Sequence, residues 1–355
     1  MPAGLVFALA AATSWSHARV HTGLVAPIRA SHAPFMLAEP KQSTPQGFLQ
    51  DASKRIACAS CASAATWGLI AKCNVNSVAA SSAIGLAAGA SLPAPLATAA
   101  FCGTFAGMGS LLVVPGIANA AGLGAAAAAL LATLDATNTR VLKGYGGRLG
   151  AVAALASFAS IAATPSLVQS GYLFQPSLAK AAAAPKAFAV TIGGTIVGST
   201  AMRLWAKKLA MLLLVGGTTS PLLSTPSKRA ALARRLSNPV ASASVVGLTA
   251  SLVIGPSDAA LAASAFTGAF VSMSSPQKVG SVRSLIGAAA LAGLAQVGLA
   301  AVGVGAGGKL GAAAAIGVLL MRSLRAAAAV VLLWNARAEA PQGPVYDYHP
   351  AQRLF

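Results

Sequence analysis

The sequence has little charge, and acidic residues are the scarcest of all. Only 9% of its 355 residues are charged, with six Asp and Glu in total, whereas soluble domains carry about 25% charged residues. Hydrophobic residues make up 56% of the chain, and the mean hydropathy is +0.72. This balance excludes an ordinary soluble protein and indicates a polytopic membrane protein.

Histidine is absent from the body of the chain, where catalytic and haem-binding proteins most often use it. All four histidines lie near the ends of the chain, at His17, His21, His32 and His349. No hydrolase, metalloprotease or phosphate-loop motif is present either. We therefore expect no enzyme and predict no cofactor, although bound lipids or pigments remain open.

Cysteine is also scarce. The four cysteines include a Cys58-x-x-Cys61 pair, but a zinc site needs a second pair of ligands and the sequence offers none. We expect no metal site and interpret the cysteines as small apolar side chains.

Basic residues outnumber acidic ones by 25 to 6, and they occur as short groups between apolar runs. No basic face with interleaved aromatics appears, so we expect no nucleic-acid partner. Lys and Arg near the ends of membrane segments contact anionic lipid headgroups. The sequence predicts the lipid bilayer as partner, with headgroup contacts from Arg148, Lys309, Arg234 and Arg235.

The N-terminal region is typical of a targeting leader. Residues 1–38 lack Asp and Glu and contain Arg, Ser and an apolar stretch, which fits import into an organelle at least as well as secretion. A leader that is first signal-like and then transit-like would suit a plastid reached through the secretory route. A genuine first helix is the alternative. We expect a plastid membrane, thylakoid or envelope, and next the mitochondrial inner membrane. Residues 39–77 follow as a polar link and a marginal helix, whose apolar stretch 56–71 is short of the roughly 20 residues that span a bilayer.

Long apolar runs fill the rest of the chain. The stretch 73–134 has no charge over 62 residues, and further runs follow up to Trp334. Alternating strands are absent, so every segment should be helical. The sequence predicts an all-α polytopic bundle with about nine to eleven membrane segments.

Two short strings occur twice. FCGTFAGMGS at 101–110 resembles FTGAFVSMSS at 266–275, an offset of 165, and GGRLG at 146–150 resembles GGKLG at 307–311. We interpret them as a tandem internal repeat, with copies at 78–165 and 240–336. Residues 166–239 would connect them with about two spans, and 337–355 would form a tail outside the membrane. Shared composition is the alternative explanation, and the sequence leaves open whether the copies run parallel or inverted.

Small residues four apart mark expected contacts between helices. Without side chains on one helix face, two backbones approach closely. The candidate packing positions are Gly85, Gly103, Gly107, Gly194, Gly198, Gly268 and Ser272.

Breaks rich in Gly and Pro occur at corresponding places in the two copies. Such paired breaks point to discontinuous helices around a binding site in transporters. The predicted solute or ion site comprises Gly89, Pro93, Pro95, Gly255, Pro256 and Asp258. Ordinary loops are the alternative, in which Asp258 would cap the start of a helix.

These features favour a transporter or channel-like protein that moves a small solute or ion between two duplicated units. The inference rests on architecture, because no chemical motif names a solute. A non-catalytic accessory subunit of a photosynthetic or respiratory membrane complex is the alternative. Its partners would be other membrane subunits, contacted through helix faces and the C-terminal tail.

Overall fold

A computed structural model describes residues 45–137, 142–182, 184–215 and 238–338. Within these ranges the chain is helical, and the one extended pairing is an isolated bridge between Phe174 and Val302. The predicted all-α class is confirmed for this part of the chain. The leader 1–38, Arg234, Arg235 and residues 339–355 of the predicted tail lie outside the described residues.

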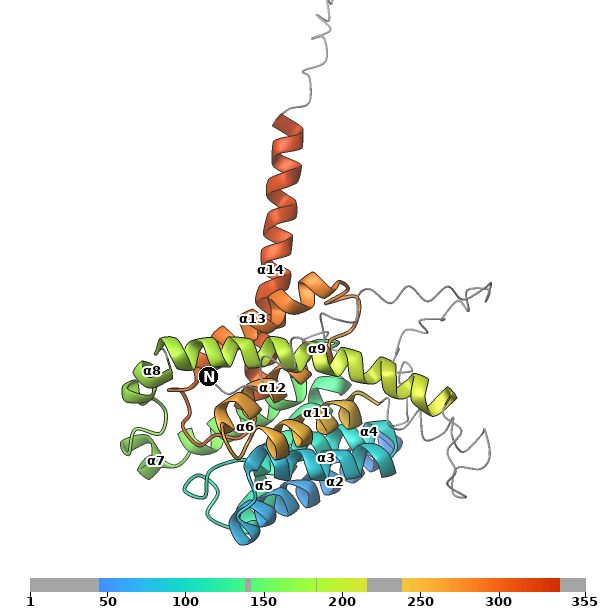
Figure 1. The fold of residues 1–355 in the computed structure, drawn as a ribbon. Helices are drawn as coiled ribbons and strands as arrows, with labels where there is room; N and C mark the ends of the chain where they lie inside the picture. Colours follow the sequence, from blue (N-terminus) through green and yellow to red (C-terminus); the bar gives the residue numbers. More distant parts are fainter. Residues whose placement is uncertain (1–44, 138–141, 183, 216–237, 339–355) are drawn as a thin grey trace, which may run out of the picture. The chain divides into compact units, whose positions relative to one another are not determined.

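Two groups of five helices follow each other along the described chain (Figure 1). The first group is α2 (Pro45–Cys73), α3 (Ser77–Ser91), α4 (Ala94–Gly107), α5 (Ile117–Ala136) and α6 (Arg148–Ala162). The second group is α9 (Pro185–Val215), α11 (Pro239–Val253), α12 (Ala259–Ser272), α13 (Val282–Leu299) and α14 (Lys309–Ala338). Two short helices, α7 (Pro165–Gln169) and α8 (Pro176–Ala182), connect the groups.

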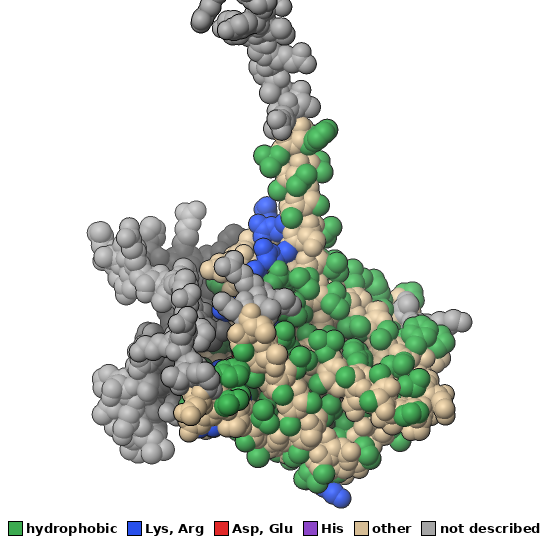
Figure 2. Space-filling view, turned by 180° about the vertical axis from the view of Figure 1, so that it is seen from behind, with side chains coloured by type: hydrophobic (Ala, Val, Ile, Leu, Met, Phe, Trp, Pro, Cys, Tyr) green, Lys and Arg blue, Asp and Glu red, His purple; other side chains and the backbone are tan. Residues whose placement is uncertain are grey.

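Five of these helices are long and apolar enough to cross a membrane: α2, α5, α9, α13 and α14. Hydrophobic side chains are spread over the described part of the face drawn in Figure 2, where Lys and Arg appear in only a few places. The chain is therefore that of a membrane protein. The predicted nine to eleven segments are not confirmed, because α3, α4, α6, α11 and α12 have only 14 or 15 residues each. At about 1.5 Å per residue, such helices are shorter than a hydrocarbon core of about 30 Å.

Helices α3 and α4 form a hairpin that turns at Ser91–Pro93. Gly85 of α3 lies against the ring of Phe101, and the Ser81 hydroxyl donates to the Thr104 hydroxyl at 2.9 Å. Proline in the first turn of α4 suits the start of a helix, where its missing N–H has no helical acceptor.

Helices α11 and α12 form a second hairpin of the same kind. Gly247 of α11 lies against the ring of Phe266, as Gly85 does against Phe101. The turn spans residues 254–258, and Asp258 caps α12 by accepting a hydrogen bond from the N–H of Leu261 at 2.9 Å. Asp258 therefore has the helix-capping role that the sequence offers as one of its two interpretations.

Four phenylalanines from the two hairpins meet in the core. Phe101, Phe105, Phe266 and Phe270 are at most 2% exposed. Their ring centroids lie 4.6 Å apart within α4, 4.3 Å apart within α12 and 5.1 Å apart between Phe105 and Phe270. Tilted and edge-to-face pairs at these distances are the favoured aromatic geometry. The repeated Phe-x-Gly-x-Phe string therefore forms the contact between the hairpins.

The two groups exchange matching backbone contacts. The N–H of Ser110 donates to the carbonyl of Gly305 at 2.8 Å, and the N–H of Ser275 donates to the carbonyl of Gly144 at 2.9 Å. Each donor is the last residue of one of the two repeated ten-residue strings, 101–110 and 266–275. Each acceptor belongs to the loop before the last helix of the other group.

The Gly-Gly-basic-Leu-Gly strings also meet each other. A Cβ atom on either Gly150 or Gly311 would lie 2.6 Å from the Cα of the other. Gly147 and Gly308 occupy the left-handed region, with φ of 85° and 82°, where glycine is favoured. No side chain fits between α6 and α14 at this crossing, so the repeated spacing of glycines in the two strings has a steric reason.

The two hairpins pack antiparallel through α3 and α11. Ser82 contacts Gly247, Gly85 contacts Ser244, and Gly89 contacts Ala241, so the residue number falls along α11 as it rises along α3. Each hairpin turn therefore lies beside the start of the other hairpin. Because α3 has 15 residues at about 1.5 Å each, the two turns lie on the order of 20 Å apart.

The structure places all seven predicted packing positions at contacts between helices. On α4, Gly103 and Gly107 face the carbonyls of Ala59 and Ser63 in α2. On α12, Gly268 faces the carbonyl of Thr195 and the Ser272 hydroxyl donates to the carbonyl of Ser199, both in α9. Gly194 and Gly198 of α9 face α12 in return, and Gly85 lies between α3, α4 and α11. Helices α2 and α9 thus hold equivalent places in the two groups.

Candidate solute pocket

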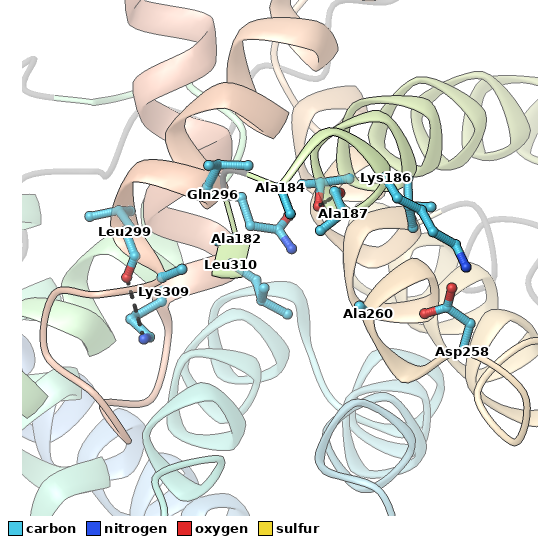
Figure 3. Close-up of a pocket in the computed structure, with 14 residues that line it drawn as sticks. Ala182, Ala184, Lys186, Ala187, Asp258, Ala260, Gln296, Leu299, Lys309 and Leu310 are labelled. Carbon is cyan, nitrogen blue, oxygen red and sulfur yellow. Dashed lines mark hydrogen bonds between the residues drawn. The ribbon is translucent and has the colours of Figure 1, made fainter. Parts of the chain in front are cut away.

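A cavity of about 650 Å³ lies where the starts of α9, α12 and α14 approach the end of α13 (Figure 3). This volume is in the range of pockets for small organic molecules. Most of its wall consists of Ala, Val and Leu. The polar side chains in the wall are Lys186, Thr191, Asp258, Gln296 and Lys309.

Lys186 and Asp258 share one side of the cavity. Figure 3 shows the Lys186 side chain extending from α9 towards the carboxylate of Asp258 at the start of α12. Lys186 is exposed and Asp258 is half-buried. The carboxylate already accepts the N–H of Leu261, so this side of the cavity holds charges of both signs.

Lys309 lies on the other side of the cavity, at the first residue of α14. Its Nζ atom is 3.4 Å from the carbonyl oxygens of Leu299 and Val302, at the long limit for hydrogen bonds. It is half-buried, and among the described residues no carboxylate lies within 4 Å of its ammonium group. A half-buried cation without a counter-ion is costly, so an anion at this position would be stabilised.

Gln296 of α13 has a defined orientation. Its Nε2 atom donates to the Ser264 hydroxyl at 3.2 Å, and that hydroxyl donates to the carbonyl of Ala260 at 2.8 Å. Since the hydroxyl proton is already used, the amide nitrogen must face Ser264. The amide oxygen then points away and is buried without a hydrogen-bond partner within the described chain.

The predicted site residues do not come together. Asp258 lines the cavity, and Gly255 and Pro256 precede it in the α11–α12 turn. Gly89, Pro93 and Pro95 belong to the α3–α4 hairpin, whose turn lies at the opposite end of the α3–α11 pair. The sequence identifies both turns, but their separation depends on the antiparallel packing of the two groups.

The first group of helices contains an ion cluster. Arg55 of α2 and Arg148 of α6 donate to the two oxygens of Asp135, at 2.9 and 2.8 Å. The side chain of Arg55 is 26% exposed, that of Arg148 is 14% exposed and that of Asp135 is 37% exposed. Arg148, predicted to contact lipid headgroups, thus forms an ion pair with a carboxylate, and Lys309 lines the cavity.

A second cavity, of about 470 Å³, lies between α5, α6 and residues 113–114. Its wall is apolar apart from Asn119 and Ser160, and it contains no charged residue. Among the described residues, no group of three His, Cys, Asp or Glu side chains could hold a metal ion. The first cavity is therefore the stronger candidate for a binding site.

The sequence does not single out Lys186, Thr191 or Arg55 as functional residues. Lys186 and Thr191 lie in a region interpreted as a connector, and Arg55 precedes the apolar stretch of its helix. An alignment of α2 with α9 would pair Arg55 with Thr191, but the sequences of the two helices are too different to be aligned without the structure. No protein family model matches the chain, and no curated protein or solved structure does either.

Proposed function

We propose that the two groups of helices are copies of one unit. The offset of 165 between the Phe strings also relates Gly124 to Ala289: Gly124 lies against Ala59 of α2, and the carbonyl of Ala289 accepts from the Thr195 hydroxyl of α9. The contact between α2 and α5 in the first group therefore has a counterpart between α9 and α13 in the second, in addition to the similar sequences. The reciprocal contacts between the two groups favour duplication over compositional coincidence.

The antiparallel contact of α3 with α11 supports an inverted relation of the units. Two equivalent helices that pack antiparallel are related by a two-fold axis perpendicular to them. Helices α6 and α14 also run antiparallel, since Gly147 contacts Ala315 and Gly308 contacts Ala154. With the membrane normal along α3 and α11, one unit would be inserted upside down relative to the other.

An inverted relation requires an odd number of crossings in each unit. Three crossings result if α2 and α5 traverse the membrane together with α6, whose 15 residues span a locally thinned bilayer, while the α3–α4 hairpin returns to its own side. The second unit would use α9, α13 and α14 in the same way, with α11–α12 as its hairpin. Since Figure 1 draws α14 running across α9, this arrangement requires α14 to turn relative to α9 in the membrane. Inverted repeats with interrupted helices are a feature of several transporter folds.

We propose on this basis that the protein moves a small solute across an organelle membrane. The observation that carries the proposal is the cavity at the turn of the second hairpin, which contains Asp258 and two lysines in a largely apolar wall. A largely apolar concave space with a few convergent charged side chains is typical of a small-molecule site. The leader-like residues 1–38 favour a plastid membrane, with the mitochondrial inner membrane second.

A swelling assay in liposomes tests transport for a broad set of solutes. Liposomes containing the purified protein are diluted into iso-osmotic solutions of neutral, cationic and anionic solutes, and light scattering reports entry. We expect at least one solute to enter faster than in protein-free liposomes. Ala260→Trp, which fills the cavity, should abolish that entry.

Val197→Trp is the matched control, because Val197 lies on an open face of α9, is 57% exposed and does not line the cavity. It should retain the flux. Entry no faster than in protein-free liposomes for every solute, or flux that persists in Ala260→Trp, would contradict transport through this cavity.

A second candidate is an accessory subunit of a larger membrane complex, and the end of α14 favours it. Val330, Val331, Leu332, Leu333 and Trp334 are 57–75% exposed. An apolar helix face without protein contacts fits either lipid or another subunit. Native gel electrophoresis of mildly solubilised membranes distinguishes the two, since a subunit migrates with its complex and a carrier at the mass of the monomer or a small oligomer.

A further inference from the structure

The repeat relation maps the ion cluster of the first unit onto the wall of the cavity in the second. Arg148 corresponds to Lys309 through the Gly-Gly-basic-Leu-Gly strings. Asp135 corresponds to Ala300 at the offset of 165 that relates α5 to α13. Both Lys309 and Ala300 line the cavity.

Arg55 completes the comparison. Gly103 faces Ala59 in the first unit and Gly268 faces Thr195 in the second, which relates α2 to α9 at an offset of 136. Arg55 then corresponds to Thr191, which also lines the cavity. All three members of the ion cluster thus have their counterparts around one space.

The second unit keeps one charge of the three. The carboxylate of Asp135 is replaced by the methyl group of Ala300 and the guanidinium of Arg55 by the hydroxyl of Thr191, while Lys309 retains its positive charge. In the first unit the carboxylate neutralises two cations. In the second unit the space of that carboxylate belongs to a cavity of about 650 Å³.

We propose that the cavity binds a small organic carboxylate, whose carboxylate group takes beside Lys309 the place that Asp135 takes beside Arg148. This inference deepens the proposed transport function and rests on it for the role of the pocket. The Ala, Val and Leu wall accepts an apolar body, and the ammonium of Lys309 accepts the charged end. At the other side of the cavity Lys186 and Asp258 bring one charge of each sign, so a second negative charge on the solute would gain little there.

Butyrate and butyramide test the charge requirement, since they have the same size and differ in charge. Binding to the purified full-length protein in lipid nanodiscs is measured by calorimetry and by thermal unfolding, with sodium chloride held at constant ionic strength. We expect butyrate to bind and raise the unfolding temperature with concentration, and butyramide to bind at least about tenfold more weakly. Equal affinities for the two would overturn the proposal.

Two substitutions test the position. Lys309→Met should weaken butyrate binding about tenfold or more, whereas Lys278→Met, a lysine near Tyr145 and outside the cavity, should leave it unchanged. Ala300→Asp keeps Lys309 and supplies a carboxylate from the protein itself. We expect it to fold and to lose butyrate binding, so the proposal stays testable even if Lys309→Met does not fold.

Butyrate binding that survives Ala300→Asp would sink the inference. The outcomes also separate the inference from the proposed function. Carboxylate binding without flux in liposomes contradicts transport and leaves the site intact, whereas flux restricted to neutral or cationic solutes contradicts the carboxylate site and leaves transport intact.

Discussion

Gly193 and Gly194 are neighbours on α9, yet they have different surroundings. Gly193 is exposed, and a Cβ atom there would meet nothing within 4 Å. A Cβ atom on Gly194 would lie 2.7 Å from the Cβ of Ser264, and one on Gly198 would clash with the carbonyl of Ala265. The close approach of α9 to α12 therefore depends on individual glycines rather than on the glycine content of the helix.

We expect Gly198→Ala to destabilise the fold by about 2 kcal/mol or more, because the added methyl forces two packed backbones apart. Gly193→Ala is the matched control, on the open face of the same helix. It should be neutral or stabilise by up to about 1 kcal/mol through helix propensity. Thermal unfolding of the two variants in the same detergent measures the difference, and equal effects would contradict the packing role of Gly198.

The spacing of small residues in the sequence is sufficient to find these glycines but not their partners. These glycines face the backbone carbonyl groups of Ala59, Ser63, Thr195 and Ala265. Every residue has a backbone carbonyl, so the sequence contains no pattern that marks these partners. The same holds for the pocket. Asp258 stands out because acids are rare in apolar segments, whereas Thr191 and Ala300 are significant only by comparison with Arg55 and Asp135.

Single helices in this protein differ in how much of their length is packed. In α14, residues near Lys309 contact α6 and line the cavity, whereas Leu324 and the residues from Val330 to Trp334 are exposed. Figure 1 shows this second half of α14 extending away from the other described helices. Helix α13, by contrast, has Leu285 in the core at 1% exposure. Leu285 therefore differs from Leu324 and Leu332 in its burial and not in its hydrophobicity.

Leu285→Ala should cost about 2–5 kcal/mol, since it leaves a cavity in a packed core. Leu332→Ala should change the stability of the isolated protein by less than about 0.5 kcal/mol, because its side chain has few protein contacts to lose. Unfolding of both variants in detergent provides the measurement. A large loss for Leu332→Ala in the isolated protein would mean that the end of α14 packs against protein, for example a second copy.

The sequence predicts the helix breaks correctly as features of the chain, but not as hairpin turns. A run without charge from Cys73 to Leu134 has the length of two to three spans, and hydropathy does not distinguish a span from a buried hairpin. The short lengths of α3 and α4 and the close pairing of Gly85 with Phe101 make that distinction. Apolar length alone therefore does not determine the number of membrane segments.

At the scale of the whole chain, the sequence does not determine whether the two units run parallel or inverted, because similar sequences can be oriented either way. The contacts between helices do indicate the orientation, because Ser82 contacts Gly247 and Gly85 contacts Ser244, which pairs α3 and α11 antiparallel. The inverted duplication that we propose would expose equivalent ends of the two units to opposite sides of the membrane. The two hairpin turns provide the means to detect it.

Ser91 and Ser257 lie in the turns of the first and second hairpins, and both are exposed. Native Cys73 is exposed, ends α2 and lies four residues before α3, whose start is beside the turn that holds Ser257. In a chain whose other cysteines are alanine, a membrane-impermeant maleimide should label Cys73 and Ser257→Cys from the same side of sealed vesicles. It should label Ser91→Cys from the opposite side. Labelling of both turns from one side would contradict the inverted arrangement, because antiparallel hairpins aligned with the membrane normal place their turns at opposite faces.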